Sequence, residues 1–258
     1  MARIFITGST DGLGLAAAEQ LLSQGHQVVG HARSRDRAVE LRDSVPDIEQ
    51  VVVGDLSSVR ETASIAEQVN AIGHFDAVIH NAGIGYREPR KITTVDGHAH
   101  LLAINVLAPY LLTALITPPD RLIYLSSGMH RGGTPSVEDL DWDHRQWNGT
   151  QAYADSKLLD ATLAFAVARM WPSVRSNAVE PGWVATKMGG SGAPDDLTKA
   201  HVTQTWLAVS DSPQALVSGQ YFYHQQPRAT NPAVRSVEFQ DALIGALAEL
   251  TDVTLPAA

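Results

Sequence analysis

The sequence of 258 residues contains no cysteine, which excludes disulfides, thiolate metal sites and cysteine nucleophiles. It also lacks any apolar run long enough to cross a bilayer. The residues after Met1 enter a strand-like segment rather than the apolar stretch of a signal peptide. Basic residues are outnumbered, and the formal net charge of −9 argues against a broad nucleic-acid footprint. We therefore expect a cytoplasmic protein that neither binds nucleic acid nor spans a membrane.

Metal-binding patterns are missing as well. The histidines show neither the HExxH motif nor another spacing typical of metal ligands, so we expect no metal. No long Gly/Ser/Pro linker or break in composition divides the chain. With 44% hydrophobic and 18% charged residues, the composition is that of a globular protein with a large core. These features predict one domain over residues 1–258.

Short β-branched runs alternate with longer amphipathic segments along the chain. Strands are predicted at 3–6, 27–30, 50–53, 76–80, 121–126, 174–179 and 220–223. Helices are predicted at 14–24, 35–43, 58–72, 94–116, 151–170 and 237–250, with one more before the last strand. This alternation predicts an α/β fold with a doubly wound parallel sheet of about seven strands and helices on both faces. Ligands of such sheets bind beyond the carboxyl ends of the strands.

A glycine-rich turn follows the first predicted strand. Gly8, Gly12 and Gly14 open a helix with the spacing Gly-x-x-x-Gly-x-Gly. Glycine permits a tight turn and close approach of a pyrophosphate, and the N–H groups at the helix N-terminus favour the anion. Taken alone, the motif is equally compatible with a plain strand–helix turn.

The end of the second strand indicates which dinucleotide is bound. Ala32 occupies the place where an acidic residue would accept the ribose hydroxyls of NAD. Arg33 and Ser34 follow, with two further arginines nearby, and a guanidinium binds phosphate well. We therefore favour NADP(H), with NAD(H) as the alternative. Asp11 opposes this choice because it places a carboxylate in the glycine-rich turn. A solvated basic turn is the other explanation for the arginines.

Tyr153 and Lys157 lie four residues apart on a predicted helix and share one face. A free tyrosine, with a pKa of about 10, is poorly matched to proton transfer at neutral pH. A neighbouring ammonium favours the phenolate and improves the match. A pair of this kind also occurs as an ordinary solvent-facing pair, so only its order after the glycine-rich turn indicates hydride-transfer chemistry.

These motifs together resemble the short-chain dehydrogenase/reductase family over nearly the whole chain. The matching segments are Thr7 to Gly14, Asp55-Leu56, Asn81-Ala82-Gly83, Asn105, Ser126-Ser127, Tyr153-x-x-x-Lys157 and Pro181-Gly182-x-Val184-x-Thr186. The resemblance implies a Rossmann-like fold and a nicotinamide cofactor, NADP(H) being favoured. It also implies a catalytic set of Asn105, Ser127, Tyr153 and Lys157.

The same resemblance implies a role for each of these side chains. Tyr153 would be the general acid/base, and Lys157 would also bind the nicotinamide ribose. Ser127 would hydrogen-bond the substrate oxygen, Asn105 would position a water, and Thr186 would contact the carboxamide. The expected cofactor-binding residues are Gly8, Ser9, Thr10, Gly12, Leu13, Gly14, Arg33, Ser34, Asp55, Leu56, Asn81, Ala82, Gly83, Tyr153, Lys157, Pro181, Gly182, Val184 and Thr186.

A narrower likeness is to the retinol-dehydrogenase-like branch of the family, which usually prefers NADP(H). It rests on Thr94-Val95-Asp96-Gly97, His100-Leu101, Ser156-Lys157-Leu158 and Ser218 to Phe222. Glu180, just before Pro181, departs from the family pattern. We expect its side chain to point to solvent, the alternative being that it lines the active site.

Two segments are predicted to contact the substrate, at about 128–150 and 187–200. The first carries Trp142 and Trp147, which either form a hydrophobic pocket or pin a surface loop to the body. The second is rich in glycine and could close as a lid. We expect a small, apolar carbonyl or alcohol substrate.

Two other classes of function remain as alternatives. One is a nucleotide-sugar epimerase or dehydratase, and the other is a non-catalytic dinucleotide sensor. The family resemblance further implies a homodimer or homotetramer formed through the predicted helices 94–116 and 151–170.

Overall fold

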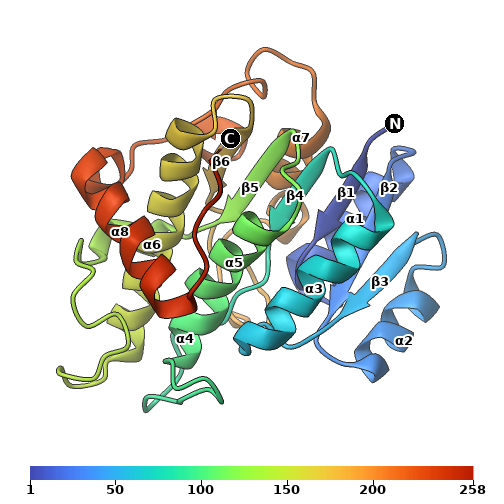
Figure 1. Cartoon of the computed structure of the whole chain (residues 1–258). Coiled ribbons are helices and arrows are strands. Elements are labelled where there is room, and N and C mark those ends of the chain that lie inside the picture. Colours follow the sequence, from blue (N-terminus) through green and yellow to red (C-terminus); the bar gives the residue numbers. More distant parts are fainter. Residues whose placement is uncertain (258) are drawn as a thin grey trace.

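The computed structural model describes residues 1–257 and contains one eight-stranded sheet with the order β3-β2-β1-β4-β5-β6-β7-β8 (Figure 1). All pairings are parallel except that of β7 with β8. The strands are β1 (Arg3–Ile6), β2 (Gln27–Ala32), β3 (Gln50–Val53), β4 (Ala77–His80), β5 (Arg121–Leu125), β6 (Arg175–Val179), β7 (Tyr221–Tyr223) and β8 (Gln226–Pro227). The predicted doubly wound parallel sheet is confirmed, and the short antiparallel β8 is an addition to it.

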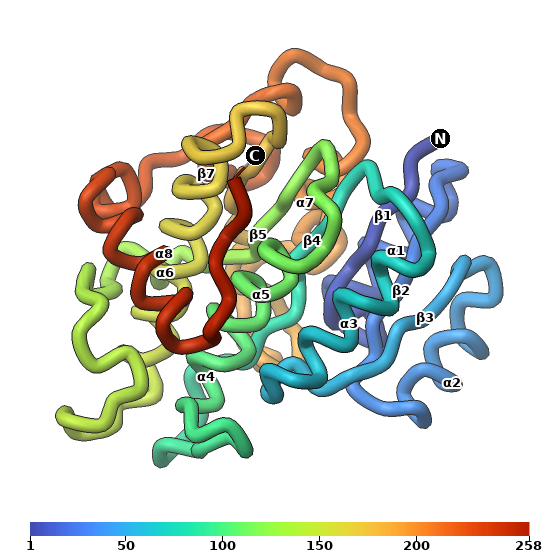
Figure 2. The backbone as a smooth tube through the Cα atoms, viewed as in Figure 1, coloured from blue at the N-terminus to red at the C-terminus, as the bar shows by residue number. Residues whose placement is uncertain are grey.

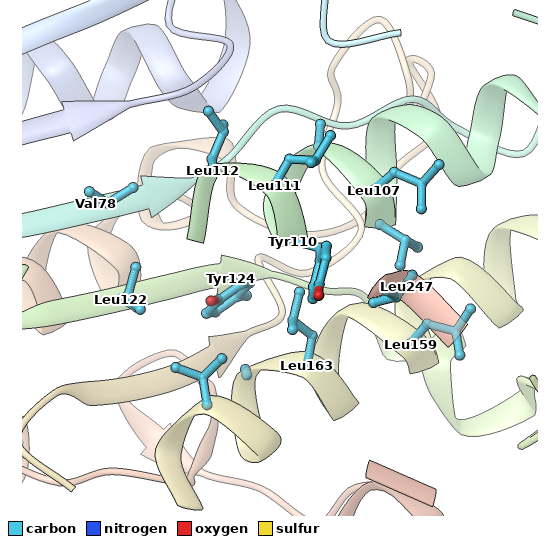
Figure 3. Packing of buried hydrophobic residues seen from close by; sticks show 14 of the residues in the cluster. Val78, Leu107, Tyr110, Leu111, Leu112, Leu122, Tyr124, Leu159, Leu163 and Leu247 are labelled. Atoms are coloured by element: carbon cyan, nitrogen blue, oxygen red, sulfur yellow. The ribbon is translucent and has the colours of Figure 1, made fainter. Parts of the chain in front are cut away.

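Helices cover both faces of this sheet. They are α1 (Gly12–Ser23), α2 (Arg35–Ser44), α3 (Val59–Ile72), α4 (His100–Leu102), α5 (Ala108–Leu115), α6 (Gly149–Met170), α7 (Val202–Val209) and α8 (Val237–Thr251). Successive strand residues point to opposite faces. Phe5 therefore packs in one core cluster with α3, α5, α6 and α8, whereas Ile4 and Ile6 pack in the other with α1, α2 and α7. Figure 3 shows the first cluster, where Tyr110, Tyr124 and Leu163 fill the space between sheet and helices.

The predicted helix over 94–116 begins later than expected. Residues 94–99 form a turn closed by the bridge between Thr93 and Ala99, with Gly97 at φ 92°. The helix starts at His100 and widens into a π-helical segment, η1 (Ala103–Leu107), before α5. Pro109 has no N–H for the carbonyl of Asn105, which gives a physical reason for the wider turn. Asn105 lies in this segment.

The C-terminal helix packs on the outside of α6, whose residues 152–167 are all buried (Figure 1). The segment after α8 returns past α5 (Figure 2). There the Tyr110 hydroxyl donates to the carbonyl of Val253 at 2.7 Å, and Trp171 Nε1 donates to the carbonyl of Pro256 at 2.8 Å. The homodimer or homotetramer stays a prediction.

Candidate active site

The glycine-rich turn between β1 and α1 is held in shape by close backbone packing. Gly8 adopts φ 63°, and a Cβ there would lie 2.9 Å from the Cα of Ala82. A Cβ on Gly14 would lie 2.3 Å from the carbonyl oxygen of Gly8 and 2.5 Å from Asn81 Nδ2. Any side chain at these two positions would therefore push the turn away from the strand end after β4.

Polar side chains tie the same turn to its neighbours. Asn81 Nδ2 donates to the carbonyls of Thr7 at 3.0 Å and Gly8 at 3.1 Å. The N–H of Gly8 donates to His31 Nδ1 at 3.0 Å, so His31 Nε2 carries the proton and donates to the carbonyl of Gly54 at 2.9 Å. Burial lowers the pKa of His31, in keeping with this neutral form. His31 was assigned no role from the sequence, although it stands at the end of a predicted strand.

Two predicted cofactor residues have buried side chains. Ser9 is fully buried, and its hydroxyl accepts the N–H of His31 at 2.8 Å. Leu56 belongs to the core cluster on the α6 side of the sheet. Because these side chains are taken up by contacts within the fold, either residue would bind a cofactor through its backbone atoms.

Basic side chains gather where α1 and α2 begin. Arg33 is exposed just after β2, and Ser34 caps α2 by accepting the N–H of Arg37. Arg37 donates to Thr10 Oγ1 at 2.9 Å and pairs with Asp11 at 3.2 Å. Lys187 of the 187–200 loop pairs with the same carboxylate at 2.8 Å. Two cations thus face Asp11, one of which, Arg37, also pairs with Glu40.

The predicted catalytic lysine and asparagine meet at the carboxyl edge of the sheet. Lys157, on α6, is buried, and its Nζ donates to the carbonyl of Leu125 at 2.6 Å. Asn105 is also buried; its Oδ1 accepts the N–H of Ile84 at 2.9 Å. A Cβ on Gly83 would be 3.4 Å from Asn105 Oδ1 and 3.5 Å from Lys157 Nζ, so the three residues adjoin one another.

The two adjacent serines after β5 differ in their surroundings. Ser126 is buried, and its hydroxyl donates to the carbonyl of Lys157 at 2.7 Å, which occupies it in holding α6. Ser127 is partly exposed, and its hydroxyl accepts the N–H of Met129 at 3.3 Å. Ser127 is therefore the one of the two whose hydroxyl can reach a ligand.

Tyr153 lies under a small apolar cluster. Its ring meets Tyr86 edge-on, with centroids 5.8 Å apart, and its hydroxyl lies 3.9 Å from the sulfur of Met188. Ile84 and Met129 pack in the same cluster. Met129 belongs to the predicted 128–150 segment, whereas Ile84 and Tyr86 were not anticipated from the sequence, because nothing local marks a loop residue that will contact a distant helix.

Both predicted substrate segments contribute to this cluster. Met188 comes from the 187–200 loop. From the 128–150 segment, Trp142 is buried against Trp147, with ring centroids 5.5 Å apart, and Arg145 stacks on Trp142 at 3.6 Å. Trp142 thus pins the segment to the body and also belongs to the cluster around Tyr153, so the two interpretations of its role are compatible.

Glu180 does not point to solvent, contrary to expectation. Its side chain is only 4% exposed and pairs with Arg131 at 3.1 Å and with Arg228. The hydroxyl of Tyr221 donates to it at 3.1 Å, and burial together with this carboxylate raises the pKa of Tyr221 well above its usual range. Burying a lone carboxylate is costly, and the paired arginines compensate for the burial of Glu180.

His130 extends this network to the loop after β5. Its Nδ1 bonds the carbonyl of Ser127 at 2.7 Å, and its ring stacks on Tyr221 with centroids 4.4 Å apart. The end of β6, the β7 strand and the loop after β5 are therefore held together beside the candidate site.

A tyrosine–lysine pair and a glycine-rich turn at the carboxyl edge of a doubly wound parallel sheet define a Rossmann-like oxidoreductase. Comparisons with known proteins agree with this class. A family model described as enoyl-(acyl carrier protein) reductase matches residues 8–216. An uncharacterized oxidoreductase of Emericella nidulans is 42% identical over 99% of both chains. A short-chain dehydrogenase of Penicillium rubens is 41% identical over 100% of both chains.

More distant similarities extend the same relationship. Human retinol dehydrogenase 13 is 27% identical over 98% of this chain and 85% of its own. The crystal structure of an uncharacterized Mycobacterium paratuberculosis protein superposes with a TM-score of 0.84, at 25% identity, covering 99% of this chain and 95% of that one. The chain belongs to the short-chain dehydrogenase/reductase family and is an oxidoreductase, and its likeness to the retinol-dehydrogenase-like branch is confirmed. Within residues 1–257, no helix combines the length and apolar character required to cross a membrane.

Proposed function

We propose that this oxidoreductase transfers a hydride between NADP(H) and an apolar carbonyl or alcohol, with Tyr153 as general acid/base. The proposal is supported by the convergence of Asn105, Lys157 and Gly83 beside the helix that carries Tyr153. The glycine-rich turn and the nearby basic side chains have the chemistry that a dinucleotide requires, namely a close backbone and cations for phosphate.

When bound, the nicotinamide dinucleotide supplies or accepts the hydride at the carbonyl carbon. In reduction, Tyr153 donates its phenolic proton to the carbonyl oxygen, and the hydroxyl of Ser127 hydrogen-bonds that oxygen as charge develops. The Lys157 ammonium, fixed by the carbonyl of Leu125, stabilises the resulting phenolate. Asn105, held by Ile84, donates to the hydroxyl of Ser156 at 3.0 Å and so fixes the helix next to Lys157.

The preference for NADP(H) rests on the exposed Arg33. Asp11 carries less weight against this choice than the sequence indicates, because Arg37 and Lys187 already pair with it. We expect calorimetric titration to show tighter binding of NADPH than of NADH. Arg33→Ala should weaken NADPH binding about 10- to 100-fold and leave NADH binding unchanged, because only the former has a 2′-phosphate.

Arg60→Ala, which removes an exposed arginine from α3, is the matched control for this titration. Equal affinities of the unmodified protein for both cofactors would refute the preference. Binding of neither would refute the cofactor assignment altogether.

The role of Tyr153 is tested by removing its hydroxyl. Tyr153→Phe should lower kcat about 10²- to 10⁴-fold, the usual contribution of a general acid. Tyr86→Phe removes a hydroxyl from the neighbouring ring and should leave kcat within a few-fold of the unmodified enzyme. Full turnover by Tyr153→Phe would overturn the mechanism, and dinucleotide binding without turnover of any carbonyl would favour the sensor alternative.

The apolar cluster above Tyr153 supports an apolar substrate. Ile84, Tyr86, Met129 and Met188 all pack there, and a carboxylate placed among them would lose its hydration. We expect an aryl alkyl ketone to be reduced with a higher kcat/KM than an α-keto acid of similar size. The reverse order would refute the substrate class.

A further inference from the structure

A second buried charge lies directly beneath the candidate catalytic lysine. Asp160 follows Lys157 by three residues on α6 and is 1% exposed. Its Oδ2 is 3.5 Å from Lys157 Nζ. Among residues 1–257, its Oδ1 has no hydrogen-bond partner and is shielded from solvent. A buried carboxylate of this kind is costly, so its single close cation determines how it behaves.

The remaining titratable groups around Asp160 are neutral at physiological pH. Tyr124 of β5 lies between the sheet and α6, as Figure 3 shows, and its hydroxyl bonds Thr113 Oγ1 at 2.7 Å. Burial raises the pKa of Tyr124, and the charge of Asp160 adds to the effect. Behind it, His80 of β4 bonds the same Thr113 hydroxyl at 3.2 Å, and burial lowers the pKa of His80 to about 3. Of these groups, only Lys157 and Asp160 can carry a charge near neutral pH.

We propose that Asp160 is a positioning residue of the active centre, whose carboxylate offsets the Lys157 ammonium and thereby keeps Tyr153 in its protonated, proton-donating form. The proposal rests on the function proposed above, since it assigns Tyr153 and Lys157 their roles. An uncompensated ammonium would draw Tyr153 toward the phenolate, the form that oxidises alcohols. With that charge offset, more of Tyr153 carries the proton that carbonyl reduction consumes.

The Asp160 charge that offsets the Lys157 ammonium changes over the pH range in which the enzyme would work. Burial raises the pKa of Asp160 to about 7, while Lys157 acts in the opposite direction. The carboxylate therefore gains its charge as the pH rises through neutrality.

The decisive measurement follows the ionisation of Tyr153 directly. With tyrosine labelled by ¹³C at the phenolic carbon, the Tyr153 resonance is assigned by its loss in Tyr153→Phe and titrated against pH. Asp160→Asn should move its ionisation midpoint about one pH unit lower than in the unmodified protein. Asp155→Asn removes another buried carboxylate from α6, one that faces Arg145 and Gln151, and should leave the midpoint unchanged.

A midpoint in Asp160→Asn that equals or exceeds that of the unmodified protein would overturn the proposal. Should the variant fail to fold, the unmodified protein still provides a test, because its Tyr153 resonance must show a smaller step below its own midpoint as Asp160 ionises. A resonance with a single step would also overturn the proposal. The titration needs neither cofactor nor turnover, so its failure is distinct from failure of the proposed function, which full turnover by Tyr153→Phe would reveal.

Discussion

The cofactor side and the catalytic side of the candidate site are built in different ways. Around the glycine-rich turn, contacts are made mainly by backbone atoms and by neutral groups such as Asn81 and His31. On the catalytic side, beneath the apolar cluster of Tyr153, the structure relies on buried charges, including Lys157, Asp160 and Glu180. Steric fit therefore governs the first side, whereas charge balance governs the second and should make it sensitive to pH.

The largest effect is expected from breaking the steric fit. Gly14→Ala would place a methyl group 2.3 Å from the carbonyl oxygen of Gly8, so the turn must move. We expect the free energy of unfolding to fall by about 3–4 kcal/mol, with loss of dinucleotide binding. Chemical denaturation and calorimetry measure both. Gly245→Ala, on α8 with open space at its Cβ, should be neutral or slightly stabilising.

The next effect concerns charge on the catalytic side. The folded-state pKa of Asp160, raised to about 7, lies above its ordinary value of 3.8. The folded protein therefore binds more protons than the unfolded chain between these values, and stability is lost as the pH rises through them. Asp160→Asn removes this loss. The free energy of unfolding of Asp160→Asn, relative to that of the unmodified protein, should therefore rise by about 2–3 kcal/mol from pH 5 to pH 8. Urea denaturation of both proteins at the two pH values measures the change, and a constant difference would contradict it.

A smaller loss is expected at Glu180. Glu180→Ala leaves Arg131 and Arg228 without their shared carboxylate, but their side chains are 39% and 48% exposed and can turn to water. We expect destabilisation of about 2 kcal/mol, below the range for a fully buried pair. Glu67→Ala, at an exposed site on α3, serves as the control. If the two variants unfold at the same temperature, the ion pairs of Glu180 with the two arginines contribute nothing to stability.

The smallest effect should come from the contact that joins the two sides. Lys187 and Asp11 pair at 2.8 Å, yet their side chains are 86% and 51% exposed. Lys187→Ala should change the free energy of unfolding by less than about 0.5 kcal/mol. Denaturation at low and high salt would check this, and a large, salt-independent loss would show that the 187–200 loop is anchored more firmly than its exposure indicates.

Short-range patterns were the part of the fold that could be predicted. Alternating strands and helices, the glycine-rich turn and the Tyr153–Lys157 spacing each depend on residues close in sequence. The helix over 94–116 was misjudged because its apolar pattern continues through a turn that Gly97 and the Thr93–Ala99 bridge impose. Likewise, Ser9 looks like a loop residue, but packing of β2 beside it buries its side chain.

By itself, the sequence determined the family, the sheet and the order of the candidate catalytic residues, because these depend on local spacing and backbone preference. Only the tertiary structure decided which charges are buried and what faces them. Glu180 became an internal ion-pair partner and Asp160 the counter-charge of Lys157, since burial and distance set the energy of a charge. Met188 and Tyr86 meet Tyr153 for a related reason, as contacts between distant segments exist only once the chain has folded.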